Sequence, residues 1–544
     1  MPGRMHEVEL VEAADEPARS RSAPAPEPRR PSWSGRPGQR VDVELDDELE
    51  SRELHDADLH VDAARTWLRR HARWLVPVAA VLAVALVGTQ VVMNHREAAR
   101  LAALAAIPGV VPPADASIGV LWRADPRTAN VLQSGSVVGG RLVGGTQDES
   151  GALSIVGLDP DTGTVAWATP VDLPTAPEAT VGATPSVWVA CTPVTHGEGS
   201  VAACIAQRYG GDDVVLGVPE STVVVLDPAD GSVLADRAVP STTGLTFTDG
   251  DLVVAERVAD DGTPARTDAS SVRWAVTASD VVDGETTWTW TSPAVDVLGR
   301  EDGPQASNAT GAATLQTVDD EVLLTVDEHA WILSDTGRPL RDIPLDPGSW
   351  MGPARAGVFI QNTWTSSDRY RGSLLLADGT EVPVDETAGW LAVDDGSAPG
   401  IVFTVGAGPQ EVQGLSGRSA RTGEELWHLP GSIATALLLD GTLYVAADES
   451  IVALDATTGE TRWRRTLDQV PQQLSTDGRY LLVPGTGVTL SAYALRDGEL
   501  AWQKDLAQEV AGDRDPVFVQ GFQSGWHDPR LYVWMDSGAV AVLG

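Results

Sequence analysis

The sequence has few basic residues and almost no lysine. Its 544 residues include 38 lysines and arginines against 77 aspartates and glutamates, a formal charge of -39, and Lys504 is the only lysine. Such an excess of negative charge repels phosphate backbones. The composition therefore argues against nucleic-acid binding.

Cysteine is also scarce. Cys191 and Cys204 are the only two cysteines, too few for a disulfide framework or a four-cysteine metal site. A single disulfide between them is plausible if this part of the chain lies in an oxidising compartment.

One apolar run stands out in this charged sequence. Residues 74–93 contain no charged side chain, and about 20 such residues are needed for a helix to cross the apolar core of a bilayer. We predict a single membrane span at 74–93 within a helical segment 65–106, followed by a proline-rich stalk at 107–117. A cleaved signal is disfavoured because more than seventy residues precede the run.

The arginines beside this run set its predicted orientation. Four of them, Arg65, Arg69, Arg70 and Arg73, lie on its N-terminal side, which places the N-terminus in the cytoplasm and the residues after the span outside. Residues 1–64 hold few large apolar groups, so we expect a disordered cytoplasmic tail. The tail is either simply solvated or a docking segment for a cytoplasmic partner.

The remainder of the chain is repetitive. The phrase "IVALDATTGETRWRRTL" at 451–467 recurs as "IVGLDPDTGTVAWATPV" at 155–171. Each copy predicts a strand, a tight turn containing glycine, and a second strand with a Trp four residues after the glycine. Asp455 is placed to accept backbone N–H groups of its turn. The Gly and Trp pairs are Gly163 and Trp167, Gly284 and Trp288, Gly423 and Trp427, Gly459 and Trp463, and Gly498 and Trp502.

Weaker copies around Gly231, Gly337 and Gly379 lack the Trp. A period near forty residues with several strands in each unit is typical of propeller blades. The strand at 118–125 carries a Trp without partners beside it, and 530–544 supplies two strands, so together they complete a blade. The count is then nine units, but because propellers commonly have at most eight blades, we predict about eight, with one weak copy misinterpreted.

The phrase "ALDATTGETRW" at 453–463 resembles the repeat of quinoprotein-like (PQQ-like) β-propellers. The resemblance covers 118–544 and implies an all-β fold in which the repeated Trp packs between neighbouring blades. Dehydrogenases of this family bind a quinone beside adjacent cysteines and use calcium. The two cysteines here are thirteen positions apart, so we expect no cofactor, no metal site and no enzymatic activity.

The segment 187–220 enlarges its blade and contains both cysteines. It is either a disulfide-pinned hairpin on the rim or a loop that binds a partner.

These features predict a single-pass cell-membrane protein with an extracytoplasmic propeller. Its expected role is non-enzymatic binding or scaffolding at the cell envelope, with an envelope protein or cell-surface ligand as the unidentified partner. A sensor that signals to the tail is the alternative.

Overall fold

The computed structural model describes most of the chain from residue 88 onward. The described residues are 88–544 except 94, 149, 174–185, 210–220, 240–243, 266–268, 270, 297–312, 319–320, 327–328, 347–348, 356, 367–368, 407–412, 512–518, 525–529 and 536–537. The predicted tail at 1–64 and most of the predicted span at 74–93 lie outside this part. Among the described residues, no helix has the length and apolarity that a bilayer crossing needs.

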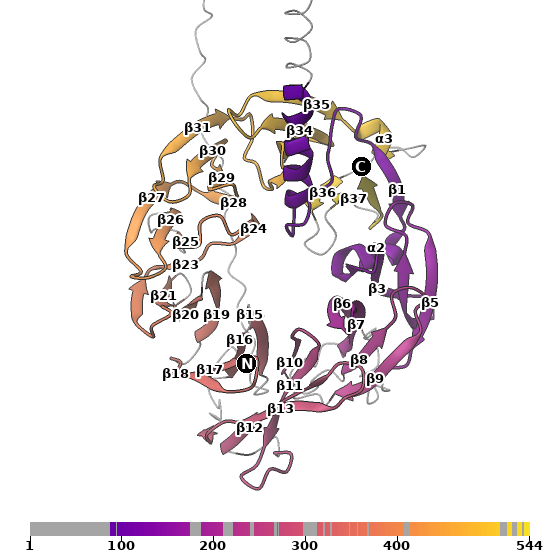
Figure 1. Cartoon of the computed structure of the whole chain (residues 1–544), viewed down its shortest axis with the longest axis vertical. Helices are drawn as coiled ribbons and strands as arrows, with labels where there is room; N and C mark the ends of the chain where they lie inside the picture. Colours follow the sequence, from indigo (N-terminus) through magenta and orange to yellow (C-terminus); the bar gives the residue numbers. More distant parts are fainter. Residues whose placement is uncertain are drawn as a thin grey trace, which may run out of the picture. The chain divides into compact units, whose positions relative to one another are not determined.

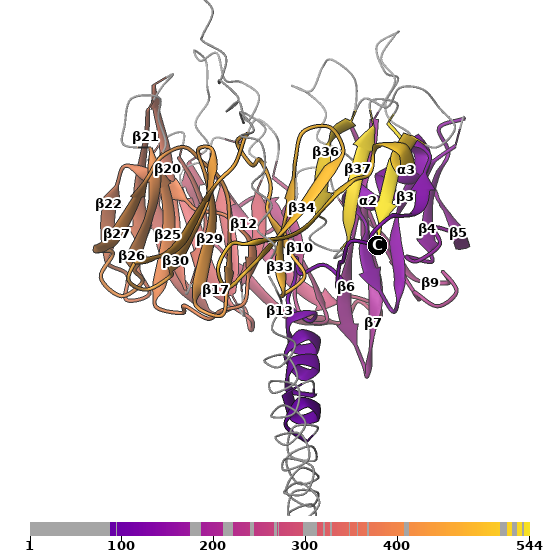
Figure 2. The same ribbon diagram turned by 90° about the horizontal axis from the view of Figure 1, so that it is seen from above.

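Residues 92–544 form one compact unit, in which antiparallel sheets stand side by side around a central axis as a closed ring (Figure 1). Seen from the side, the strands run between the two rims (Figure 2). The described strands form nine sheets, one for each blade. The expectation of about eight blades was therefore wrong. The weak copies around Gly337 and Gly379 are both blades.

The first strand of each blade lies nearest the axis and the last strand lies on the outside (Figure 1). The first four blades are β2 (Ser136–Val138), β3 (Arg141–Gln147), β4 (Leu153–Leu158) and β5 (Val165–Val171); β6 (Ser186–His196), β7 (Gly199–Tyr209), β8 (Ser221–Leu226) and β9 (Val233–Val239); β10 (Gly244–Phe247), β11 (Asp251–Val258), β12 (Ser271–Asp280) and β13 (Thr286–Thr291), with β14 (Val295–Asp296) beside β12; and β15 (Thr314–Val318), β16 (Glu321–Val326), β17 (His329–Ser334) and β18 (Pro339–Pro344).

The next four blades follow the same plan, except that one gains an inner strand from the connection between the first two strands of the preceding blade. They are β19 (Ser349–Arg355), β20 (Val358–Ser366), β21 (Arg369–Leu375) and β22 (Glu381–Val384); β23 (Glu386–Ala388), β25 (Ile401–Gly406), β26 (Gly414–Ser419) and β27 (Glu425–Pro430); β24 (Leu391–Asp394), β28 (Ile433–Leu439), β29 (Thr442–Ala447), β30 (Ser450–Asp455) and β31 (Thr461–Thr466); and β32 (Ser475–Thr476), β33 (Tyr480–Pro484), β34 (Thr489–Ala494) and β35 (Leu500–Asp505). β24 pairs with β28 in parallel.

The ninth blade is the composite that the sequence suggested. β36 (Val519–Ser524), β37 (Leu531–Met535) and β38 (Val540–Leu543) are completed by β1 (Val120–Ala124), which pairs antiparallel with β38. Gly119 and Gly544 exchange both backbone hydrogen bonds at 3.0 Å. The ring closes through this pair, which leaves neither strand unpaired at the junction.

The segment predicted as a stalk packs against the propeller. Residues 95–104 are helical, and Leu104 and Val110 are buried in one cluster with Tyr444 and Leu481. Val111 N–H donates to the carbonyl of Thr476 at 2.8 Å.

Further along the segment, Ala114 N–H donates to the Asp477 carboxylate at 3.1 Å, and the ammonium of Lys504 donates to the carbonyl of Ile118. The segment before β1 is thus held by the two blades that end in β31 and β35.

Candidate functional site

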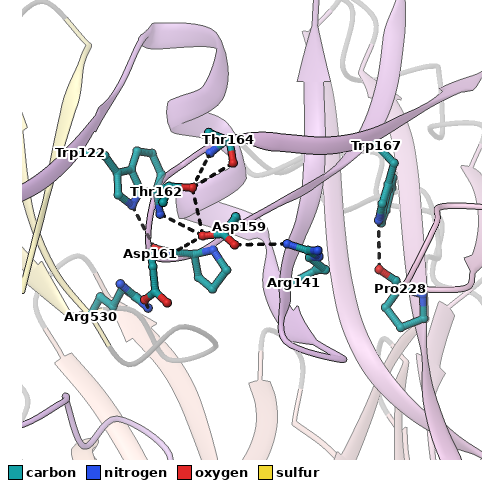
Figure 3. A network of polar contacts seen from close by, with 10 residues as sticks. Trp122, Arg141, Asp159, Asp161, Thr162, Thr164, Trp167, Pro228 and Arg530 are labelled. Atoms are coloured by element: carbon teal, nitrogen blue, oxygen red, sulfur yellow. Dashed lines mark hydrogen bonds and ion pairs between the residues drawn. The ribbon is translucent and has the colours of Figure 1, made fainter.

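The repeated tryptophans join neighbouring blades. Five of them reach forward from an outer strand and cover the turn glycine of the next blade. The glycine has positive φ, 68° at Gly163, and a Cβ added there would lie 2.3 Å from the Trp122 ring. The Trp122 indole N–H donates to the carbonyl of Pro160 in the same turn at 2.9 Å (Figure 3).

This contact, which we call the Trp–Gly latch, recurs around the ring. In the latches described below, a Cβ on the glycine would collide with the preceding blade's indole. The pairs are Trp122 on Gly163, Trp167 on Gly231, Trp288 on Gly337, Trp427 on Gly459, and Trp463 on Gly498. The indoles of Trp167, Trp427 and Trp463 donate to Pro228, Ala456 and Leu495 at 3.0, 3.1 and 2.9 Å.

Other side chains replace Trp at three junctions. Arg237 covers Gly284 and donates to the carbonyls of Asp280, Val281 and Val282. Arg341 donates to the carbonyls of Leu376 and Ala377, and Val382 covers Gly423. Trp502 is packed against an apolar cluster, and its buried indole N–H has no hydrogen-bond partner among the described residues.

An aspartate organises several of these turns. Asp455 accepts backbone N–H groups from Thr457 and Thr458 at 3.1 and 3.0 Å. Hydrogen bonds from Arg462 and from the turn hold the pKa of Asp455 below its usual value. Asp159 accepts in the same way and also contacts Arg141 (Figure 3). The repeat residues therefore build and join the blades.

A cavity of about 750 Å³ lies where the first two blades meet, beside the helix α2 (Pro126–Ser134). Figure 1 places α2 and β6 on the inner side of the ring. The cavity is lined by Asn130, Gln133, Ser134, Gly145, Thr146, Gln147, Leu153, Val187, Trp188, Val189, Ala190, Cys191, Thr192, Ile205 and Phe247. The lining residues from Val187 to Ile205 fall in the segment 187–220 that the sequence offered as a possible partner-binding loop, whereas those of α2 and β3 were not predicted as site residues.

The helix α2 owes its position to its first residues. Asp125 caps it by accepting N–H bonds from Arg127 and Thr128 at 3.0 and 2.8 Å, and Pro126 occupies the first turn, where its missing N–H costs nothing. Val131 and Leu132 are buried against the blades. Asn130, Gln133 and Ser134 are spaced to share one face and line the cavity.

Two consecutive glycines in β3 allow this close packing. A Cβ on Gly144 would lie 3.0 Å from Val131 of the helix, and one on Gly145 would lie 2.4 Å from Val189 of β6. Paired glycines within a strand indicate close approach of a neighbour. "RLVGGTQ" at 141–147 was therefore the sequence signal that could have revealed this site.

The wall opposite the helix is fixed by the disulfide. Cys191 and Cys204 face each other across β6 and β7 and are bonded, with 4.0 Å between their Cα atoms. Both are buried in the cluster between the first two blades. The hydroxyl of Ser136 donates to the carbonyl of Cys191 at 2.5 Å. Residues 186–209 thus form the two inner strands of a blade, and the cavity lies against the first of them.

Exposed tryptophans also concentrate on the inner parts of the ring. Trp188 in β6, Trp350 in β19 and Trp390 just after β23 are 44%, 47% and 65% exposed. The large apolar side chains exposed on the described outer strands, such as Val165 and Leu500, are aliphatic. Among the described residues, the tryptophans classed as exposed thus lie on or beside inner strands, whereas outer-strand tryptophans such as Trp288 and Trp463 are only partly exposed.

A second polar cluster lies on the blade of β23 and β27. Ligand atoms of Glu386, Glu425 and His428 lie within 4.8 Å of one another, as a metal site would require. However, Arg418 Nε lies 2.8 Å from Glu386, and its Nη2 lies 3.1 Å from Glu425. The guanidinium already supplies the positive charge, so we interpret this cluster as an ion-pair network.

The nine sheets and their latches define a β-propeller. Residues 410–542 match the model of the family described as outer membrane protein assembly factor BamB, which confirms the resemblance of the repeats over that stretch. No curated protein sequence matches the chain.

Three solved structures are similar at low identity. BamB from Moraxella catarrhalis is 15% identical with a TM-score of 0.35, and 79% of this chain and 98% of that chain are covered. The computationally designed Ika8 protein is 13% identical with a TM-score of 0.32, covering 80% and 99%. A eukaryotic initiation factor is 9% identical with a TM-score of 0.39, covering 74% and 90%. None superposes closely enough to support an argument about function.

Proposed function

We propose that the protein is a membrane-anchored, non-enzymatic binding module that holds a protein partner at the cell envelope. The observation that carries this proposal is the concentration of exposed tryptophans on the inner parts of a closed ring. Tryptophan is enriched among the residues that dominate binding energy at protein interfaces. The match of residues 410–542 to a family of assembly factors supports the same class of function.

The repeat residues and the titratable cluster described above have structural partners. The repeated residues are engaged in latches, and the best cluster of titratable groups among the described residues is neutralised internally by Arg418. In this proposal the apolar run at 74–93 is the anchor, and the arginines before it favour an orientation with the propeller outside the cytoplasm.

Site-specific photocrosslinking in living cells tests the binding role. A photoreactive phenylalanine analogue replaces either Trp350 or Leu500, which are 47% and 44% exposed on an inner and an outer strand. We expect discrete envelope proteins to be crosslinked from position 350 and not from position 500. Equal adducts from both positions, or none from position 350, would contradict the proposal.

Cysteine accessibility tests the orientation. In a Cys191→Ala, Cys204→Ala background, one new cysteine is introduced at Thr457, in an exposed propeller turn, or at Ser32 in the tail. A membrane-impermeant maleimide applied to intact cells should label only the first. Labelling of the Ser32→Cys variant alone would show that the tail lies outside the cell, which is the opposite of the proposed orientation.

A further inference from the structure

The cavity beside α2 differs from the rest of the molecule in charge. None of its fifteen lining residues is ionisable at neutral pH, although the chain carries 77 acidic and 38 basic residues. A charged ligand would be desolvated there without a countercharge, which is costly. The cavity therefore favours a neutral ligand.

The cavity nevertheless offers hydrogen bonds. Asn130 and Gln133 of α2 are exposed and Gln147 of β3 is partly exposed, and their side-chain amides make no hydrogen bond within the described part of the chain. Each amide provides donors and an acceptor together. A ligand with hydroxyl groups, which are also both donors and acceptors, would satisfy them.

The opposite wall supplies an aromatic surface. Trp188 lines the cavity and is 44% exposed, and Phe247 lies in the same lining. The face of an indole ring is apolar and electron-rich, so it attracts the C–H groups on the flat side of a pyranose ring. The disulfide in β6 and β7 fixes the strand that carries Trp188.

From these three features we infer that the cavity binds a neutral oligosaccharide, with a sugar ring against Trp188 and its hydroxyls on Asn130, Gln133 and Gln147. The volume of about 750 Å³ falls within the range of small-molecule sites. Of the three exposed inner tryptophans this site uses only Trp188, and its lining comes from the first three blades without Trp350 or Trp390. The two proposed roles can therefore be tested at different positions.

Calorimetric titration of the full-length protein tests the inference. The protein is held in a detergent without a sugar headgroup, because such a headgroup would compete. The probes are the neutral tetrasaccharides of glucose in α- and β-linkage, of mannose and of N-acetylglucosamine, with tetragalacturonate as the charged comparison. We expect at least one neutral probe to bind in the micromolar to millimolar range and tetragalacturonate not to bind.

Substitutions then locate the binding. Trp188→Ala and Gln133→Ala should each weaken the affinity about tenfold or more, whereas Trp350→Ala should leave it unchanged. An unchanged thermal midpoint shows that each variant is folded, and Gln133 makes no hydrogen bond within the described part that folding would lose.

Three results would overturn the inference. They are no binding of any neutral probe, equal affinity for tetragalacturonate, or an affinity that survives Trp188→Ala. Crosslinking of a peptide segment from position 188, with no saccharide bound, would also contradict it and would assign the cavity to a protein partner. None of these results bears on crosslinking from position 350, so the two proposals fail separately.

Discussion

At the scale of single residues, the turn glycines meet two demands at once. Gly459 has φ 70°, which side chains with a Cβ rarely adopt, and a Cβ there would lie 2.4 Å from the Trp427 ring. The first demand comes from the turn within a blade, and the second comes from the neighbouring blade. Gly441 has the same φ of 70° but open space around it, so the two demands can be separated.

We predict that Gly459→Ala destabilises the propeller more than Gly441→Ala. The control loses about 1 kcal/mol, from backbone strain alone. Gly459→Ala adds steric conflict with the indole, for a total of about 2–4 kcal/mol. Chemical denaturation monitored by tryptophan fluorescence measures both, and equal losses would show that the latch contributes nothing.

The ion-pair network around Glu386 makes stability depend on pH. Burial raises the pKa of Glu386. Hydrogen bonds from Arg418, Thr404 and Ser416 together lower it by more than burial raises it, so the pKa lies below the usual value. A lowered pKa in the folded state means that the charged carboxylate stabilises the fold above the unfolded pKa of about 4.3. This contribution is lost as the pH falls through the folded pKa.

We therefore expect Glu386→Gln to reduce the free energy of unfolding by about 1–3 kcal/mol at pH 7. The difference from the parent protein should shrink as the pH falls below about 4. Denaturant titrations from pH 3 to pH 7 test this, with Glu424→Gln in the exposed neighbouring turn as the control. A difference that stays constant with pH would show that the carboxylate charge is not responsible.

The residue pattern was predictable only where the repeat is regular. Spacing identified the glycines and tryptophans because the same contact recurs at a fixed distance along the chain. Arg237, Arg341 and Val382 fill the corresponding place with unrelated side chains, and no spacing rule connects them to tryptophan. The network of Glu386 and Arg418 joins residues 32 positions apart, which no local pattern indicates.

At the scale of elements, the segment before β1 is part of the propeller. Val110 and Val111 are each only 2% exposed, and Leu104 is 5% exposed. Composition suggested a spacer because the segment is rich in proline. Its apolar residues instead pack against the two blades that end in β31 and β35. Its packing could not be read from the sequence because both partners are distant along the chain.

Truncation should distinguish the contribution of the helix to thermal stability from that of the packed segment. A chain that begins at Leu101 lacks residues that, where described, are helical and exposed, so it should unfold at nearly the same temperature as one that begins at Val92. A chain that begins at Ile118 loses several buried side chains, and its midpoint should fall by at least about 5 °C. Equal midpoints for all three chains in differential scanning calorimetry would contradict the structural role of the segment.

The helix α2 was not predicted, although its signals are present. Asp125 and Pro126 form a helix start of the usual kind. Strands were predicted on either side, and no nine-residue helix was expected between them. The cavity was not predicted either, because it depends on the helix and on strands from three blades.

At the scale of the whole molecule, the sequence contains nine repeat units, and the expectation of about eight blades came only from the usual maximum for propellers. All nine units found in the sequence form sheets. The two weakest copies retained a strand, a turn glycine and a second strand, and these were sufficient to form a blade. The missing tryptophans changed only the junctions.

The formal charge of -39 should make the ring sensitive to ionic strength. Like charges around a compact unit repel one another, and salt screens that repulsion over distances of about 10 Å at 0.1 M. We expect the thermal midpoint of the propeller to rise between about 0.01 M and 0.15 M sodium chloride. A falling midpoint would mean that local ion pairs such as that of Arg355 and Asp394 outweigh the overall repulsion.

The pairing of β1 with β38 also fixes the order of events when the protein is made. Synthesis proceeds from the N-terminus, so Trp122 is made long before Val542, the residue opposite it. Until Val542 is made, β1 has no partner strand to hold the Trp122 indole over Gly163. The eight other blades can accumulate in sequence, but the circle is completed only by the last strand to arrive, so the interval before its arrival is when the nascent protein is most exposed to proteases and to mispairing with another copy.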